Sequence, residues 1–245
     1  MNIFKKKPAL KLAKTYDVCK TDQPKITVVL LHGIASDSNT FNGFIKHFEK
    51  TKISEAVRLI TFDLLGAGKS SKSNDLNYDY DEQIEALKNS IHDLKTKTPI
   101  ILIGHSMGTL IAARYANLYP RLVDGLILVS PPSYREEEMR DPSFAKGMDG
   151  FAKLVGYKNP EAIKSKAFNN EIKLIVSNLE NYENFVRLKQ PTYVIYGELD
   201  KIIASYNLPA LTRANSNLHI TKTIGSHGVT PDKYDKIIKS IQYFL

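Results

Sequence analysis

The sequence contains one cysteine and no tryptophan. A single cysteine, Cys19, excludes an internal disulfide and any zinc site built from several cysteines. The start of the chain, MNIFKKKPALKLAKTYD, lacks an apolar stretch long enough for a signal peptide or a membrane span. From these absences we expect a cytoplasmic location without membrane insertion, with Cys19 packed inertly in a strand.

The sequence contains 26 Asp and Glu residues and 34 Lys and Arg residues, which gives a net charge of +8. The lysines are scattered, and only residues 5–7 form a run. Neither a basic helix nor an RNA-reading aromatic motif stands out. The excess therefore indicates a lysine-rich composition, and we expect no nucleic-acid partner. A metal motif such as H-E-x-x-H is also missing, so we expect no metal and no cofactor.

The chain shows no internal repeat, low-complexity tract or interdomain linker, and 245 residues suit one domain. Short apolar runs alternate with stretches of helical periodicity. We predict strands at 25–31, 57–63, 99–104, 125–130, 191–197 and 218–224. We predict helices at 39–50, 80–97, 107–119 and 231–244. This alternation is typical of an α/β fold with a mostly parallel sheet flanked by helices.

Residues 133–189 break the alternation, because this segment is charged and helical and contains no clear strand. A crossover between parallel strands needs only about a dozen residues. We therefore predict a helical cap at 133–189, inserted into a core of residues 1–132 and 190–245. The alternative is a single lengthened crossover helix.

The stretch GHSMG, from Gly104 to Gly108, fits the pattern G-x-S-x-G between a predicted strand and a predicted helix. Small residues on both sides allow the strand and the helix to approach closely, and Ser106 is held at the corner. This context predicts a nucleophile. The alternative is a serine that only caps the helix.

A serine needs a base to accept its proton and a group that orients this base. His227 follows the last predicted strand in a loop between glycines, where an imidazole could reach Ser106, and His219 is the second choice. For the carboxylate we choose Asp200, which follows a strand, over the nearby Glu198. The chain order Ser106, Asp200, His227 differs from the orders of chymotrypsin and subtilisin.

Acyl transfer also needs donors for the oxyanion of the tetrahedral intermediate. We nominate the backbone N–H of Met107, directly after the nucleophile. The second donor is expected in the loop after the first predicted apolar strand, at Ile34, with Ala35 next. The alternative interpretation of His32–Gly33 is a tight exit from that strand.

The stretches LLHGIAS, ITFDLLGAGKSSK, LIGHSMGTLIAARYANLYP, LILVSPP, YGELDKII and SHG occur in order across about residues 25–227. With them the chain resembles the α/β-hydrolase fold superfamily, in its small capped carboxylesterase-like branch. The resemblance implies a Ser106 nucleophile, an Asp200 acid, a His227 base, and oxyanion donors at Ile34 and Met107. It also implies an antiparallel hairpin at the start; this start is short, so we expect one edge strand to be missing and the site to be unaffected.

The expected activity is hydrolysis of small to medium, mostly uncharged carboxylic esters through an acyl-enzyme on Ser106. Members of this fold that cleave haloalkanes or epoxides carry an aspartate at the position of Ser106. The serine therefore argues against both of these activities. Carbon–carbon bond hydrolases and perhydrolases remain open, as does a small-molecule receptor or signalling module with little turnover. The only partner we expect is the ester substrate, and the sequence indicates no oligomeric state.

Substrate contacts are expected from apolar residues of the predicted cap. The primary candidates are Phe144, Met148 and Phe151, followed by Leu154 and Phe168. Apolar contacts discriminate between substrates by only about 1–3 kcal/mol for each methylene-sized change. The cap is therefore predicted to control chain-length preference more than chemistry.

Overall fold

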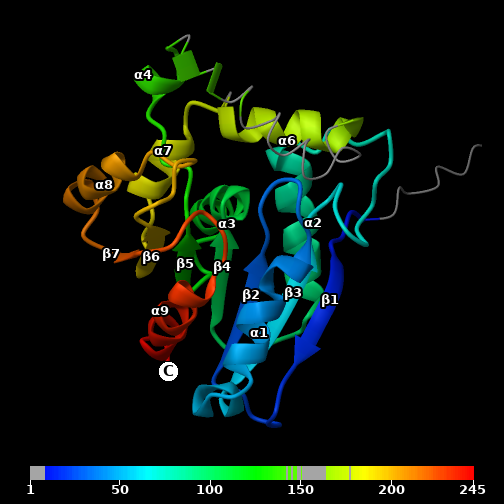
Figure 1. Ribbon diagram of the computed structural model, residues 1–245. Helices are drawn as coiled ribbons and strands as arrows, with labels where there is room; N and C mark the ends of the chain where they lie inside the picture. The colour runs from blue at the N-terminus through cyan, green and yellow to red at the C-terminus, as the bar shows by residue number, and fades with distance from the viewer. Residues whose placement is uncertain (1–8, 142, 145, 148–149, 151–163, 177) are drawn as a thin grey trace, which may run out of the picture.

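A seven-stranded sheet forms the centre of the computed structural model (Figure 1). The structure describes residues 9–141, 143–144, 146–147, 150, 164–176 and 178–245. The strand order is β1-β3-β2-β4-β5-β6-β7, with β1 antiparallel to β3 and every other pair parallel. The strands are β1 Ala13–Val18, β2 Ile26–Leu31, β3 Val57–Asp63, β4 Ile100–His105, β5 Gly125–Val129, β6 Thr192–Gly197 and β7 Leu218–Thr223.

Helices cover both faces of the sheet, which confirms the predicted α/β class. The α-helices are α1 Asn42–Phe48, α2 Tyr80–Asp93, α3 Met107–Leu118, α4 Glu136–Met139, α6 Lys166–Val176, α7 Asn181–Val186, α8 Leu208–Ala214 and α9 Pro231–Gln242. Short 3-10 helices are η1 Ser38–Phe41, η2 Lys52–Glu55 and η4 Ser205–Asn207. None of the helices in the described residues combines the length and the hydrophobicity needed to span a membrane.

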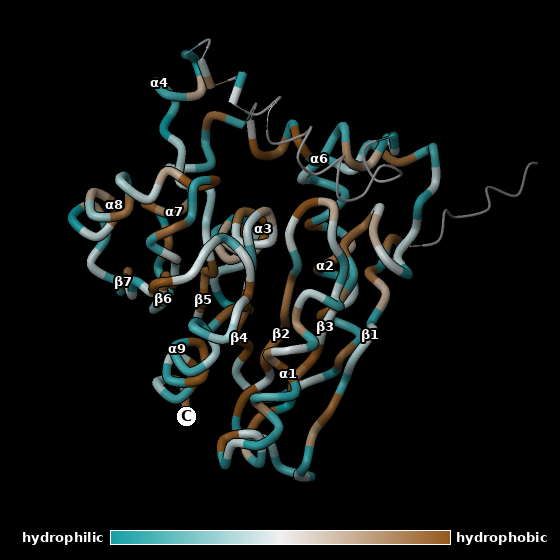
Figure 2. The backbone as a smooth tube through the Cα atoms, viewed as in Figure 1, coloured by the Kyte–Doolittle hydropathy of each residue, from teal (hydrophilic) through white to brown (hydrophobic). Residues whose placement is uncertain are grey.

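The central strands β2, β4 and β5 are mostly apolar and buried at every position, because helices cover both of their faces. On β2, Val28 and Leu30 belong to a core cluster that includes residues of α1 and α9. Their neighbours Val29 and Leu31 belong to a second cluster, shared with α2 and α3. Figure 2 shows hydrophobic residues concentrated on these central strands. Continuous apolar runs, rather than alternating ones, are what a parallel sheet between two helical layers requires.

Among the described residues, one antiparallel edge strand, β1, stands where the resemblance implies a hairpin, in agreement with the expected loss of one edge strand. Two details differ from the sequence predictions. Cys19 lies just after β1 and not in a strand; it is exposed, and its thiol donates to the carbonyl of Thr21. The helix predicted to reach residue 97 ends earlier, because Lys95 has a φ of +47°, which an α-helix does not accommodate.

The segment predicted as a cap contributes α4, α6 and α7, which lie between β5 and β6 in the chain. Helices α4 and α6 lie beyond the carboxyl ends of the strands, whereas α7 packs along α3 (Figure 1). The division of this segment from the core as a cap domain stays a prediction.

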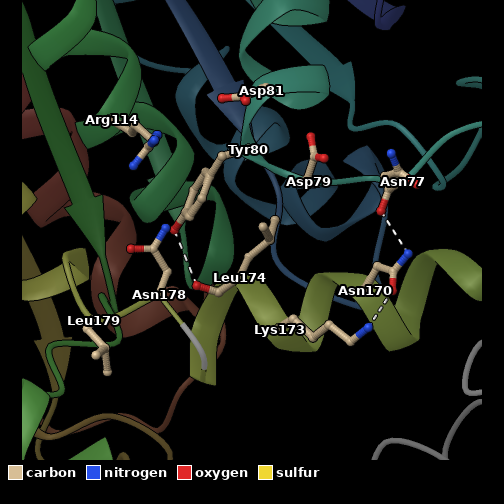
Figure 3. A pocket seen from close by; sticks show the side chains of 10 residues that line it. All are labelled: Asn77, Asp79, Tyr80, Asp81, Arg114, Asn170, Lys173, Leu174, Asn178 and Leu179. Atoms are coloured by element: carbon tan, nitrogen blue, oxygen red, sulfur yellow. Dashed lines mark hydrogen bonds between the residues drawn. The ribbon is translucent and has the colours of Figure 1, made fainter.

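At a pocket of about 560 Å³ (Figure 3), α6 is tied to the core. There Asn170 of α6 donates to the carbonyl of Asn77 at 2.8 Å. The Tyr80 hydroxyl lies 3.4 Å from the carbonyl of Leu174 on α6 and donates to Asn181 Oδ1 of α7 at 2.6 Å. Arg114 lies over the Tyr80 ring, 4.9 Å from its centroid.

A buried acid, Glu171, lies on the same helix and is only 4% exposed. Burial raises the pKa of the Glu171 carboxyl to about 8, although the backbone N–H of Ala35 partly offsets this by donating a hydrogen bond. The contact joins α6 to the loop that follows β2. The carboxyl is therefore mostly protonated at neutral pH, as expected for an acid removed from water.

We expect the Glu171→Gln variant to lose a pH dependence that the wild-type protein shows. Between the ordinary glutamate pKa and about 8, the native state keeps a proton that the unfolded chain releases, so native stability falls as pH rises. Relative to the variant, the wild type should lose roughly 2–4 kcal/mol of unfolding free energy between about pH 5 and about pH 9. Urea unfolding at both pH values measures this difference.

Glu183→Gln on α7 is the matched control, since Glu183 is exposed. Its stability should follow that of the wild type at both pH values. An identical pH slope in the wild type and Glu171→Gln would contradict the interpretation of Glu171 as a protonated, buried acid.

Candidate active site

Ser106 occupies a sharp corner between β4 and α3. Its backbone has φ +51° and ψ −121°, a region that non-glycine residues seldom adopt. A Cβ atom on Gly104 would lie 2.5 Å from the carbonyl oxygen of Gly108. A Cβ atom on Gly108 would lie 2.3 Å from the carbonyl oxygen of Leu31. Both glycines are therefore required by the close approach of β4, α3 and β2, and the serine takes the strained conformation between them.

Two backbone segments meet at this corner. Met107 is the first residue of α3, so its N–H has no acceptor within the helix. The loop after β2 passes directly against the serine, since a Cβ atom on Gly33 would lie 3.0 Å from Ser106 Cβ. Ile34 and Ala35 follow Gly33 in this loop, and Ala35 has a φ of +53°. The structure thus places the loop of one predicted oxyanion donor against the N-terminus that carries the other.

His32 ties this loop to the residue that follows β3 through two hydrogen bonds. Its Nδ1–H donates to the carbonyl of Gly33 at 2.8 Å, and its Nε2 accepts the Leu64 N–H at 2.9 Å. Burial lowers the pKa of His32, which keeps the ring neutral. A neutral imidazole with one donor and one acceptor fits both bonds.

Asp200 and His227 form a hydrogen-bonded pair at the carboxyl ends of β6 and β7. Asp200 Oδ2 lies 2.8 Å from His227 Nδ1. Burial alone would raise the pKa of the Asp200 carboxyl, but the hydrogen bond and charge of His227 and the N–H of Ile202 lower it. Since a carboxylate only accepts, Nδ1 carries the proton and Nε2 has a free lone pair.

The other candidates for acid and base are engaged elsewhere. His219 is exposed on β7 and stacks on Tyr193, with ring centroids 5.1 Å apart. Glu198 is exposed and pairs with Lys222 at 3.0 Å. A further carboxylate at a strand end, Asp63 of β3, organises a turn, because it accepts backbone N–H groups of residues 38 and 69 at 2.8 and 2.7 Å. None of these contacts involves Ser106.

His105 joins the base loop to the serine corner. Its Nε2–H donates to the carbonyl of His227 at 3.0 Å, and the two rings lie 5.1 Å apart. Because His105 is adjacent to Ser106 in the chain, this bond places the His227 loop beside the serine. A hydroxyl, an imidazole and a carboxylate thereby gather at the carboxyl ends of β4, β7 and β6, an arrangement suited to nucleophilic catalysis.

A pocket of about 660 Å³ opens between the loop after β2 and α6, lined by Ala35, Phe168 and Glu171 among others. Phe168 thus reaches the vicinity of the site. Phe144 lies elsewhere: it is half-buried, and its ring packs edge-on against Tyr134, 4.7 Å between centroids. The predicted contacts Met148, Phe151 and Leu154 lie outside the described residues.

Sequence reasoning missed a buried lysine beside the site. Lys233 has a side chain that is 0% exposed. Its position carried a signal, since it precedes the core residues Ile237 and Ile241 by one and two helical turns on the same face of α9. A cation on the buried face of an amphipathic helix needs partners.

Within the described ranges, no cluster of His, Cys, Asp and Glu could hold a metal ion.

A family model described as alpha/beta hydrolase fold matches residues 26–161. A monoacylglycerol lipase of Homo sapiens is 25% identical over 260 residues, covering 90% of this chain and 75% of the relative. Lipase 1 of Psychrobacter immobilis is 28% identical over 204 residues, 72% of this chain and 62% of that one. An uncharacterised protein of Mycobacterium tuberculosis is 36% identical over 106 residues, 42% of this chain; the match spans only 28% of that relative's length.

Solved structures agree in fold. An esterase from Exiguobacterium antarcticum superposes with a TM-score of 0.71 at 19% identity, covering 95% of each chain. A monoacylglycerol lipase from Paleococcus ferrophilus superposes with a TM-score of 0.67 at 21% identity, covering 96% of this chain and 98% of that one.

We expect Gly108→Ala to destabilise the protein, although alanine normally favours a helix by about 1 kcal/mol over glycine. The added methyl group would meet backbone oxygens of β2 and the following loop at 2.3 and 2.6 Å. Forced overpacking of this kind costs about 1–3 kcal/mol, which chemical unfolding measures directly. Gly147→Ala is the control, because its Cβ atom would meet nothing within 4 Å. Equal stability of the two variants would contradict the close approach described above.

Proposed function

The chain belongs to the α/β hydrolase fold family, and from this premise we propose that it is a serine hydrolase of small to medium, mostly uncharged carboxylic esters. The observation that carries the proposal is the 2.8 Å bond between His227 Nδ1 and Asp200 Oδ2, held beside the strained Ser106 corner. It leaves the second imidazole nitrogen free to accept the serine proton.

Acylation begins when Ser106 Oγ attacks the ester carbonyl carbon. The hydroxyl proton passes to His227 Nε2, and the carboxylate of Asp200 stabilises the resulting imidazolium and fixes the tautomer. The tetrahedral intermediate then collapses. The C–O bond to the alcohol breaks, and His227 returns the proton to the leaving oxygen. Water attacks the acyl-enzyme by the same route and releases the acid.

The negative oxygen of the tetrahedral intermediate requires donors that point toward it from the start. We assign this role to the backbone N–H groups of Met107 and Ile34. The first lies at the N-terminus of α3, where the helix dipole also favours negative charge. The second comes from the loop packed against Ser106, which His32 holds in place.

Two further points support an ester as the substrate. Sequence relatives include proteins named as lipases, and a fold neighbour is named as an esterase. The pocket beside the oxyanion loop is lined in part by Ala35, Ala167 and Phe168, which can contact an apolar acyl or alcohol group. Polar groups in the same lining could orient such a substrate but offer no cluster of one charge.

We expect Ser106→Ala to abolish hydrolysis of p-nitrophenyl acetate and butyrate while leaving the fold intact. The hydroxyl is the group that becomes acylated, so the loss should be on the order of 10⁴-fold or more. A fluorophosphonate should label the wild-type protein at Ser106, as mass spectrometry of peptides would show. Repeated turnover distinguishes an esterase from a receptor, which would acylate once and stall. Label on another serine, or substantial activity in the variant, contradicts the assignment.

The two histidines nearest the end of the chain provide a matched pair. His227→Ala should reduce kcat by several orders of magnitude, because it removes the proton acceptor. His219→Ala should lose at most about threefold, since it removes only surface stacking on Tyr193. Steady-state kinetics of both variants shows which of the two histidines is the base. If His219→Ala were inactive and His227→Ala active, the base would be misassigned.

A further inference from the structure

The loop that carries His227 is held from beneath by the buried cation of Lys233. Its Nζ donates to the carbonyl oxygen of Ser226 at 2.6 Å and to Thr230 Oγ1 at 3.3 Å. The nearest carboxylate oxygen, from Asp232, is 3.6 Å away. Burial lowers the pKa of Lys233, whereas the charges of Asp232 and Asp200 raise it. A cation removed from water is costly unless its donors are used, and here they bind the residue preceding His227.

The same loop is held from the other side by His105. This residue is 7% exposed, and its Nε2–H donates to the carbonyl oxygen of His227 itself. Burial, together with the nearby His227 ring, lowers the pKa of His105 to about 3, so the ring is neutral. Its Nδ1 is buried without a hydrogen-bond partner among the described residues, in agreement with a single proton on Nε2.

A third bond precedes these two in the chain. The carbonyl of Gly225 accepts the N–H of Leu199 at 3.1 Å, and the N–H of Gly225 donates to Asp232 at 3.1 Å. Leu199 is the neighbour of Asp200, so this bond ties the loop of the acid to the loop of the base. The three consecutive carbonyls of residues 225–227 are thus bound by groups from the loop after β6, from α9 and from β4.

We propose that Lys233 and His105 are positioning residues that clamp this loop and, through its backbone, orient the His227 imidazole between Asp200 and Ser106. The proposal rests on the proposed function of the same site. Neither residue contacts the reacting atoms. Each instead fixes one carbonyl next to the Cα atom from which the imidazole projects.

The clamp is needed because the loop consists of small residues on both sides of His227. Glycines at 225 and 228 leave the backbone free to turn, and the imidazole would turn with it. A displacement of about 1 Å at a catalytic group can cost about 10²-fold in rate. Holding both carbonyls limits that displacement without placing further groups in the substrate site.

Lys233→Met tests the α9 side of the clamp. Methionine fills a similar volume, and the Asp232 carboxylate keeps its hydrogen bonds from the Gly225 N–H and the Thr230 hydroxyl, so the substitution leaves no unpaired buried charge. We expect kcat for p-nitrophenyl acetate to fall about 10- to 100-fold with KM nearly unchanged, because orientation and not substrate binding is lost. Lys236→Met is the control, since Lys236 is exposed on the same helix; it should keep the wild-type kcat.

His105 offers a rescue that distinguishes positioning from packing. His105→Gln places an amide N–H near the position of Nε2 and should retain kcat within about fivefold. His105→Leu removes the donor and should lose about 10- to 100-fold. Equal losses in the two variants would indicate packing and contradict the clamp.

Hydrogen–deuterium exchange tests the clamp independently of ester hydrolysis. Backbone amides of residues 225–228 should exchange faster in Lys233→Met and His105→Leu than in the wild-type protein, with unchanged exchange in β2 and β4. If the wild type hydrolyses no ester, the proposed function fails while faster exchange still supports a clamp. Wild-type exchange in both variants, or a kcat within about twofold of the wild type in both, would overturn the inference.

Discussion

The close approach of β4 and α3 is the constraint on which the rest of the site depends. Gly104 and Gly108 face each other with no room for a methyl group, so the helix begins at once after the strand. Ser106 must then adopt a positive φ, which raises its side chain above the carboxyl edge of the sheet. The same geometry brings the uncapped N–H of Met107 to the place where negative charge would develop. One cause, the close approach of β4 and α3, thus positions both the proposed nucleophile and the proposed oxyanion donor.

The sequence was informative wherever a local rule governs the structure. Continuous apolar runs predicted six of the strands, because both faces of a parallel strand are buried. The flanking glycines predicted the corner at Ser106. Asp200 and His227 were predicted as acid and base because each of them follows a strand. Contacts between distant segments were not predictable in this way. The pairing of β1 with β3, the burial of Glu171 and the partners of Lys233 all depend on three-dimensional packing.

Buried polar groups surround the site on a scaffold that is otherwise apolar. Asp200, Lys233 and His105 each lose contact with water, and each recovers hydrogen bonds from the loops they hold. In a low-dielectric interior such bonds are strong and an unpaired group is costly. The network therefore permits few alternative loop conformations, which is the property that a proton-transfer site requires.

The two outer strands of the described sheet, β1 and β7, carry charged residues along its open edges. An open edge exposes backbone donors and acceptors that can add a strand from another chain. On β7, Lys222 is ion-paired and exposed, and on β1 both Lys14 and Asp17 carry charge. A strand arriving at either side would have to strip water from these ions. Charges at both margins therefore disfavour edge-to-edge pairing of the sheet whose loops carry Asp200 and His227.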